Sequence, residues 1–165
     1  MELEQHLCIL PLATLLENIA GVYLPLLMGA TVTVAPLQTL GMTGSSGLEL
    51  GQLVVGLNQH QPHSVILVPE LAMALANAAE QGSLATDSFR FLAVGGGRVS
   101  PDLLARGRSI GLPLYEGYGL SECGSVVALN VPGAEREGSV GRPLGHVQVK
   151  VDNEHRILVR GNTHL

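Results

Sequence analysis

Short apolar or β-branched runs alternate with segments of helical periodicity along the first two thirds of this chain. The runs expected to form strands cover residues 7–10, 30–35, 64–68, 89–94 and 112–116. Strands separated by helices imply right-handed crossover connections and a parallel sheet. The sequence therefore predicts an α/β fold in which a parallel sheet is flanked by helices.

Local signals set the expected ends of the helices. Thr14 and Glu17 have the spacing of a capping box, so we expect Glu17 to cap the first helix. Pro25 should kink that helix, because its ring crowds the carbonyl group of residue 21. Ser46 and Glu49 predict the start of a second helix, after a loop over residues 38–47. Later helices are expected to begin at Pro69 and at Ser100-Pro101, and Gly111 should end the last of them.

The pattern changes after Cys123. Residues 125–129, 147–151 and 156–159 read as strands without helices between them, and residues 152–155 resemble a hairpin turn. The sequence thus predicts a parallel α/β part over residues 1–123. Residues 124–165 are expected to be the beginning of an antiparallel, β-rich subdomain, and the chain as a whole looks like a fragment.

Composition narrows the classes of function. Hydrophobic residues make up 46% of the 165 residues and charged residues only 14%, which is too apolar for disorder. So little charge predicts that part of the exposed surface is apolar. Such a surface is typical of an interaction site, so we expect self-association or a complementing chain. The net charge of −5, without any basic run, argues against nucleic-acid binding.

The chain shows no sign of an extracytoplasmic location. Cys8 and Cys123 indicate neither a disulfide framework nor a metal-ligand pair, which fits a reducing cytoplasm. Its six scattered histidines are expected at the surface or at helix ends rather than as ligands. Residues 18–48 carry no charge, but prolines and glycines interrupt them, so we expect a buried segment and no transmembrane helix. No basic segment precedes the apolar start, which argues against a signal peptide.

Two glycine-bearing segments follow predicted strands. Gly95-Gly96-Gly97 comes after residues 89–94, and Gly117 to Glu122 comes after residues 112–116. Ligands of parallel α/β sheets bind beyond the carboxyl ends of the strands, where both segments should lie. Within the second segment, an aromatic ring, a glycine, a hydroxyl and a carboxylate suit a nucleotide bound with Mg²⁺. A turn with a surface glutamate, a capping serine and a packed tyrosine is the alternative interpretation.

These segments resemble the adenylate-forming superfamily, which includes acyl-CoA synthetases. Tyr118-Gly119-Leu120-Ser121-Glu122 matches the family pattern Tyr-Gly-x-Thr-Glu with serine in place of threonine, and Gly95-Gly96-Gly97 is similar to its Gly-Gly-Ala. The segments at 138–143 and 158–161 match later signatures, and residues 10–31 are most similar to the long-chain branch. The resemblance covers nearly the whole chain in the family order.

The resemblance implies a reaction and a set of roles. A carboxylic acid, expected to be a fatty acid, would attack ATP to give an acyl-adenylate, and coenzyme A would take the acyl group. Glu122 and Ser121 would be the catalytic residues, with Glu122 binding Mg²⁺ and Ser121 a phosphate. The remaining ATP/AMP contacts implied by the resemblance are Gly95, Gly96, Gly97, Tyr118, Gly119 and Leu120.

Several parts of the family's machinery have no counterpart in this sequence. They are the phosphate loop with its lysine, the aspartate that holds the ribose and the C-terminal catalytic lysine. We therefore expect a partial adenylation domain that does not complete the reaction alone. The alternatives are a non-catalytic nucleotide-binding or scaffolding fragment acting with another chain, and an unrelated parallel α/β nucleotide binder.

Overall fold

The computed structural model describes residues 2–43 and 47–161. Five strands form the parallel part of one sheet: β1 (Gln5–Cys8), β2 (Thr31–Val34), β5 (Ser64–Leu67), β6 (Phe91–Val94) and β7 (Leu114–Tyr118). Two short antiparallel strands, β8 (Ala128–Leu129) and β9 (Arg142–Pro143), continue it past β7. The order across the sheet is β2-β1-β5-β6-β7-β8-β9. The predicted α/β class, with helices around a mostly parallel sheet, is confirmed.

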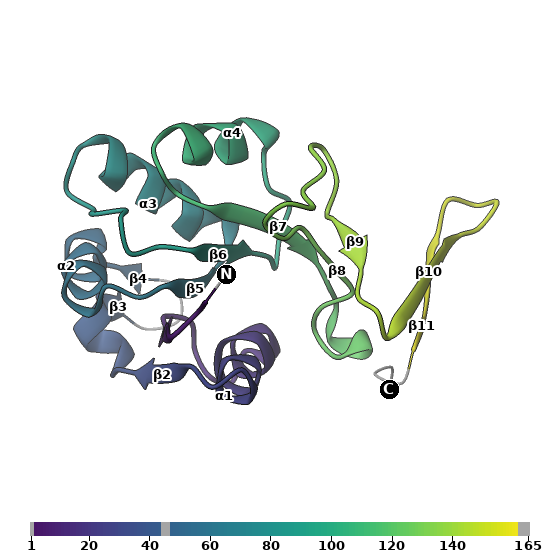
Figure 1. The fold of residues 1–165 in the computed structure, drawn as a ribbon, viewed down its shortest axis with the longest axis horizontal. Helices are drawn as coiled ribbons and strands as arrows, with labels where there is room; N and C mark the ends of the chain where they lie inside the picture. Colours follow the sequence, from purple (N-terminus) through teal and green to yellow (C-terminus); the bar gives the residue numbers. More distant parts are fainter. Residues whose placement is uncertain (1, 44–46, 162–165) are drawn as a thin grey trace.

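Three helices cover one side of the sheet and a shorter helical segment lies on the other. The three helices on the first side are α2 (Leu50–His60), α3 (Pro69–Glu80) and α4 (Pro101–Ser109). Figure 1 shows α3 and α4 on the opposite side of the sheet from α1 (Leu24–Leu27). The buried core on the three-helix side draws on alternate strand residues such as Leu7, Val65 and Leu92, none of which is exposed. Side chains alternate between the two faces of a strand, and in β5 all four residues are buried, so both faces of the sheet are covered there.

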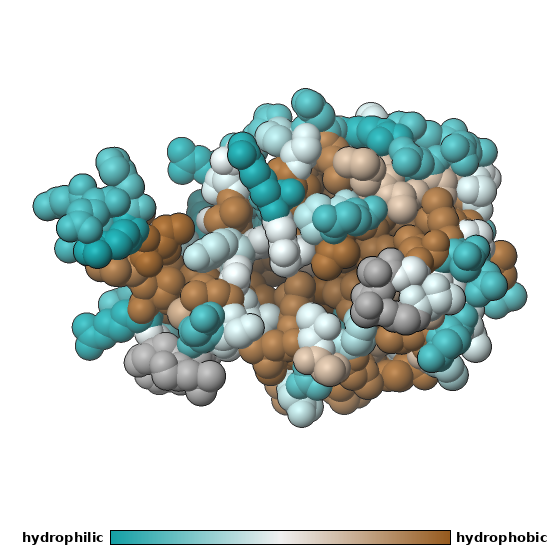
Figure 2. Space-filling view, turned by 180° about the vertical axis from the view of Figure 1, so that it is seen from behind, coloured by the Kyte–Doolittle hydropathy of each residue, from teal (hydrophilic) through white to brown (hydrophobic). Residues whose placement is uncertain are grey.

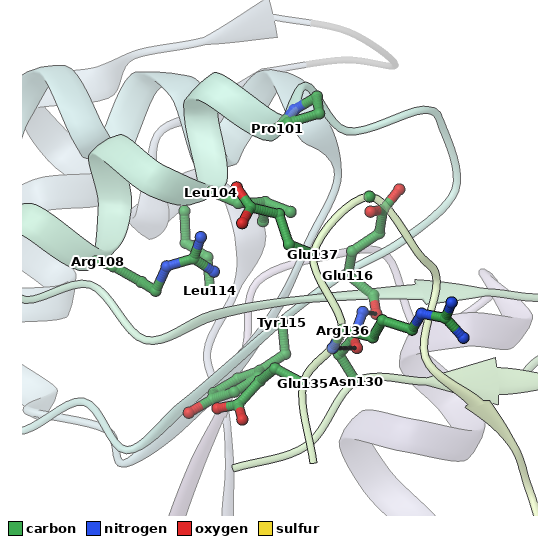
Figure 3. A pocket seen from close by; sticks show the side chains of 11 residues that line it. Pro101, Leu104, Arg108, Leu114, Tyr115, Glu116, Asn130, Glu135, Arg136 and Glu137 are labelled. Carbon is green, nitrogen blue, oxygen red and sulfur yellow. Dashed lines mark hydrogen bonds between the residues drawn. The ribbon is translucent and has the colours of Figure 1, made fainter. Parts of the chain in front are cut away.

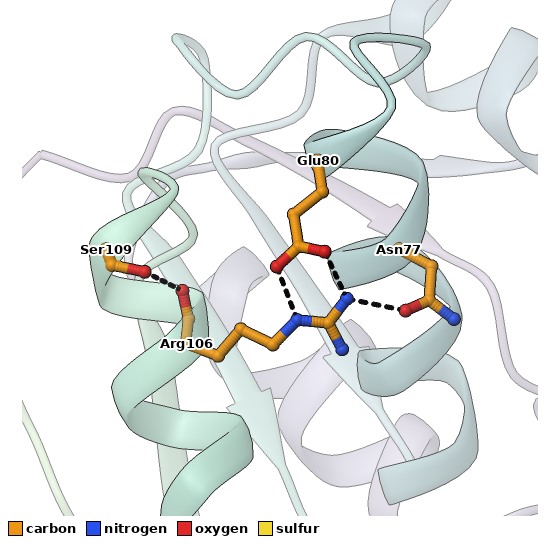
Figure 4. Close-up of polar contacts among 4 residues, drawn as sticks. All are labelled: Asn77, Glu80, Arg106 and Ser109. Atoms are coloured by element: carbon orange, nitrogen blue, oxygen red, sulfur yellow. Dashed lines mark hydrogen bonds and ion pairs between the residues drawn. The ribbon is translucent and has the colours of Figure 1, made fainter.

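An ion pair joins the two helices α3 and α4. Arg106 on α4 donates from Nε to Glu80 Oε1 at 2.5 Å and from Nη2 to Glu80 Oε2 at 2.6 Å. The same Nη2 donates to Asn77 Oδ1 at 2.6 Å, so one guanidinium spans the last turn of α3 (Figure 4). Such a bidentate contact adds geometric specificity as well as electrostatic attraction, and so constrains the position of α4 relative to α3.

The helix predicted from Thr14 differs from expectation at its start. Seven residues, Glu17–Tyr23, form a π-helix (η1) that passes directly into α1. The predicted capping role of Glu17 is wrong: no side chain caps this helix, and Glu17 is fully buried. The disturbance expected at Pro25 is present as this change of helix type. Since Pro25 has no N–H to offer the Gly21 carbonyl, the Cys8 thiol donates to that oxygen at 3.7 Å.

Other boundaries also moved. Residues predicted as a loop hold a 3₁₀ turn, η2 (Leu37–Leu40), and the small hairpin of β3 (Met42–Thr43) and β4 (Gly47–Leu48). No side chain caps α2 at Glu49, and the predicted partner Ser46 lies outside the described residues. Ser100 does precede α4, although its hydroxyl makes no capping bond. Only the last two residues of the predicted strand 125–129 pair, as β8.

The predicted hairpin is present near the C-terminal end of the described chain. Strands β10 (Val147–Val151) and β11 (Ile157–Gly161) pair antiparallel in their own two-stranded sheet and project from the rest of the molecule (Figure 1). Asp152 holds the turn, since its carboxylate accepts from Glu154 N and Arg156 N, both at 2.9 Å. The division between residues 1–123 and 124–165 stays a prediction.

In the described residues, no helix has the length and apolar character needed to cross a bilayer.

Candidate nucleotide and acid site

A large apolar cavity lies on the side of the sheet away from α3 and α4. Its volume is about 790 Å³, within the roughly 300–1,000 Å³ typical of small-molecule sites. One wall is the sheet, through Ile66, Ala93 and Gly117, and the opposite wall is the η1–α1 segment, through Ile19 and Leu24. Figure 2 shows hydrophobic residues gathered across the middle of the face seen from behind, with hydrophilic residues around its rim.

Both predicted glycine-bearing loops reach this cavity. Gly95 and Gly96, which follow β6, line it, and so do Tyr118, Gly119, Leu120 and Ser121, which end β7 and begin the next turn. The loops meet because β6 and β7 are parallel neighbours, so their carboxyl ends lie at one edge of the sheet. Gly97 and Glu122 are not among the lining residues.

Close backbone approach requires the glycine in the second loop. A β-carbon at position 119 would lie 1.5 Å from the carbonyl oxygen of Ser125. Gly96 adopts φ +78°, a conformation that glycine takes without strain. These two glycines therefore allow main chain, rather than side chains, to form this part of the cavity rim.

Ser121 and Glu122 lie at the exposed start of a 3₁₀ turn, η3 (Ser121–Cys123). Backbone bonds close the turn, with Cys123 N donating to Leu120 O at 3.1 Å and Ser125 N to the same oxygen at 3.2 Å. Across residues 2–43 and 47–161, no ion pair or hydrogen bond engages the Glu122 carboxylate. A free carboxylate of this kind fits an Mg²⁺ ion whose other ligands come from phosphates.

Tyr118 has two environments. It lines the cavity and also packs against Cys123, Val127 and Val147, which form a small second core near β8 and β10. The packing role that sequence reasoning left open is therefore real, and the ring is half-buried as a result. A face of the same ring next to the cavity is compatible with stacking on a base.

A second recess, beside Tyr115, is too small for a nucleotide. Its volume of about 20 Å³ is enough for a single water. Figure 3 shows Glu135 beside Tyr115 and Arg108 reaching toward the recess from α4. Burial, and after it the charge of Glu135, raise the pKa of Tyr115. Asn130 fixes the loop over the recess, donating to Ser139 O at 2.6 Å and accepting from Arg136 N at 2.9 Å.

Sequence reasoning missed a buried polar cluster next to the cavity. His6 and Glu17 are 1% and 0% exposed, so the expectation that the histidines lie at the surface or at helix ends is wrong for His6. His6 Nε2 lies 3.5 Å from Glu17 Oε1, and Cys8 is close by. Burial, and next the negative charge of Glu17, raise the pKa of the Cys8 thiol to about 12. The one available signal was the acidic residue within an otherwise uncharged helical segment.

Comparison with known proteins decides the family. A family model described as "AMP-binding enzyme" matches residues 2–163. The chain belongs to the AMP-binding enzyme family. Among curated members of this family, the 2-succinylbenzoate–CoA ligase of Bacillus subtilis is 29% identical over 97 residues, covering 58% of this chain and 20% of the relative. The aligned part of the chain thus spans about a fifth of the length of that ligase.

Solved AMP-binding enzymes share the fold. The anthranilate CoA ligase AuaEII in complex with anthranoyl-AMP superposes with a TM-score of 0.82 at 17% identity, over 98% of this chain and 32% of the other. O-succinylbenzoate coenzyme A synthetase from Bacillus subtilis, in complex with ATP and magnesium ion, gives 0.74 at 22% identity, over 100% and 34%. This chain therefore corresponds to about a third of each of those proteins.

Proposed function

We propose that this chain supplies the nucleotide- and acid-binding part of an ATP-dependent carboxylic acid–CoA ligase. The observation that carries the proposal is the meeting of the 95–96 loop and the 118–121 loop at one apolar cavity. In the proposed reaction, a carboxylate oxygen attacks the α-phosphate of ATP and pyrophosphate leaves. The thiol of coenzyme A then displaces AMP from the acyl carbon.

The proposed roles follow the positions of the residues. Tyr118 stacks on the adenine, Ser121 donates its hydroxyl to a phosphate oxygen, and Glu122 holds Mg²⁺, which neutralises charge on the phosphates when bound. Gly95 to Gly97 and Gly119 let main chain approach the nucleotide, and Leu120 adds apolar contact beside it. Ser121 lines the cavity, and Glu122 is its exposed neighbour outside the lining, so both side chains are accessible to a bound nucleotide.

The acid we propose is apolar and compact, with an aromatic ring as the best fit. Apart from His6, Ser64 and a few other polar groups, the lining is aliphatic or aromatic. It includes Phe91, whose ring stacks on Tyr115, outside the lining, with 5.0 Å between ring centroids. The relatives named above act on 2-succinylbenzoate or anthranilate, which are aromatic acids. The narrower expectation of a fatty acid has weaker support, because a fatty-acid ligase that matches covers only 33% of this chain. Coenzyme A as acceptor and a cytoplasmic location remain predictions.

Thermal unfolding with stable acyl-adenylate mimics tests the proposal. A ligand that binds only the folded chain raises the melting temperature of the chain. At a ligand concentration of one hundred times the Kd, the free energy of unfolding increases by about 2.7 kcal/mol. We expect a benzoyl-sulfamoyl adenosine to give a larger shift than a palmitoyl analogue, and either to exceed AMP. A larger rise in melting temperature with the palmitoyl analogue than with the benzoyl analogue would favour a fatty acid as the substrate. No shift with any adenylate would overturn the proposed site.

A further inference from the structure

We infer that His6, Cys8 and Glu17 form a binding site for a single zinc-type divalent cation. One imidazole nitrogen, one thiol sulfur and one carboxylate oxygen from these residues all lie within 4.8 Å of one another. The three residues are 0–1% exposed. This cluster is separate from the proposed nucleotide loops, and the inference does not depend on the proposed function.

Three polar atoms of the cluster lack partners, whereas the Cys8 thiol donates to the Gly21 carbonyl, a bond that it would give up on binding a metal as thiolate. Among the described residues, His6 Nε2 and both carboxylate oxygens of Glu17 are buried without a hydrogen bond. A buried carboxylate or imidazole left unpaired costs free energy, so such groups are paired or coordinate a metal. The distance of 3.5 Å between His6 Nε2 and Glu17 Oε1 is beyond a good hydrogen bond. It falls within the about 3.3–3.8 Å that separates ligand atoms around a tetrahedral zinc with bonds of about 2.0–2.3 Å.

A neighbouring hydroxyl orients the histidine as a ligand. Ser64 Oγ lies 2.8 Å from His6 Nδ1 and is itself buried. If Nδ1 carries the proton and donates to Ser64, the lone pair of Nε2 faces the cluster. Histidines that bind metals are commonly held in this way through their other ring nitrogen.

The helix on the far wall is shaped around the cluster. The π-helical turn η1 places Glu17 toward β1, and π-helical turns are frequent at functional sites. Gly21, one turn along, leaves room: a β-carbon there would lie 2.6 Å from Glu17 Oε1 and 2.9 Å from His6 Nε2.

The donor set selects the type of ion. Thiolate and imidazole ligands favour zinc over magnesium or calcium, which prefer oxygen. Three protein ligands leave a fourth position for water or for a molecule in the cavity, which His6 and Ser64 help to line.

Cobalt titration of the metal-free protein tests this site. We expect one Co²⁺ per chain, with a thiolate-to-cobalt charge-transfer band that Zn²⁺ abolishes by displacement. Cys8→Ser should remove the band, whereas Cys123→Ser, at the chain's other buried cysteine, should keep it. Ser64→Ala should weaken Zn²⁺ binding about 10–100-fold while leaving the ligands in place.

The wild-type titration alone can overturn the inference, whatever the stability of the variants. A protein with native circular dichroism that gives no thiolate band with Co²⁺ would show that the cluster is a buried His–Glu pair without a metal. A band that persists in Cys8→Ser, or disappears in Cys123→Ser, would place the ion elsewhere.

Discussion

The main chain at Gly119 passes so close to the Ser125 carbonyl group that a β-carbon would lie 1.5 Å from its oxygen. The neighbour is backbone held by β8 pairing and by Val127 N donating to Tyr118 O at 2.8 Å, so it has little freedom to withdraw. This contact ties the end of β7 to the strand that follows the 3₁₀ turn, and it fixes the loop that carries Ser121 and Glu122.

Replacing Gly119 by alanine should therefore damage both stability and the site. We expect Gly119→Ala to destabilise the fold by about 1–3 kcal/mol, the usual cost of overpacking, and to abolish any nucleotide-induced shift in melting temperature. Thermal unfolding followed by circular dichroism measures both effects. Gly145→Ala is the matched control, since that position has open space and an ordinary φ. Equal melting temperatures for the two variants would contradict the tight contact.

Tyr118 should contribute to base binding more than to phosphate binding. Tyr118→Leu keeps apolar packing against Val127 but removes the aromatic face. Stacking on a base is worth about 1–3 kcal/mol, so AMP affinity should fall by roughly 5–150-fold while pyrophosphate affinity changes little. Calorimetric titration with each ligand measures this. Tyr23→Leu, at an exposed tyrosine, serves as the control. Equal losses for the two ligands would eliminate the stacking role.

The Arg106–Glu80 pair should make stability depend on acidity. The Arg106 guanidinium, chiefly through its hydrogen bonds, lowers the pKa of Glu80 from its ordinary 4.5. A carboxylate with a lowered folded-state pKa adds stability above its unfolded pKa and loses it as the pH falls through the folded value. Glu80→Gln should thus lower the melting temperature slightly at pH 7, and the difference should vanish in acid. The effect is small because both side chains are partly exposed.

A second exposed glutamate distinguishes this pair from a general charge effect. Glu2→Gln removes the same charge at a site that forms no ion pair with any described residue, so we expect no matching pH-dependent loss. Parallel melting curves for the two variants across the pH range would mean that the α3–α4 contact contributes nothing specific.

The sequence predicts a structural feature well when residues close together in the chain determine it, and poorly when residues far apart in the chain do. The strands around Val65 and Leu92 were predictable, because a short apolar run between helices is enough to specify a buried parallel strand. The meeting of Gly95 and Tyr118 followed from the same topology, since neighbouring parallel strands end at one edge of a sheet. The family resemblance then supplied roles that spacing alone left open.

The environment of Glu17 was not predictable in this way. Its position three residues after Thr14 satisfies a local rule for helix capping, and only the fold shows that His6 and Cys8 on β1 face it. Glu17 begins the π-helical turn η1 and is fully buried there, which the capping rule does not foresee. Likewise, the short β8 depends on pairing with β7 and β9 rather than on the residues of 125–129.

The most direct test of the proposed site is the magnesium dependence of ATP affinity in Glu122→Gln. The substitution keeps the shape of an exposed side chain and removes only its charge, so the fold should be unaffected. We predict that Mg²⁺ strengthens ATP binding at least tenfold in the wild type and in the control Glu154→Gln, but not in Glu122→Gln, where a tenfold change is about 1.4 kcal/mol. An unchanged response to Mg²⁺ in Glu122→Gln would contradict the assignment of Glu122 and, with it, the proposed nucleotide site.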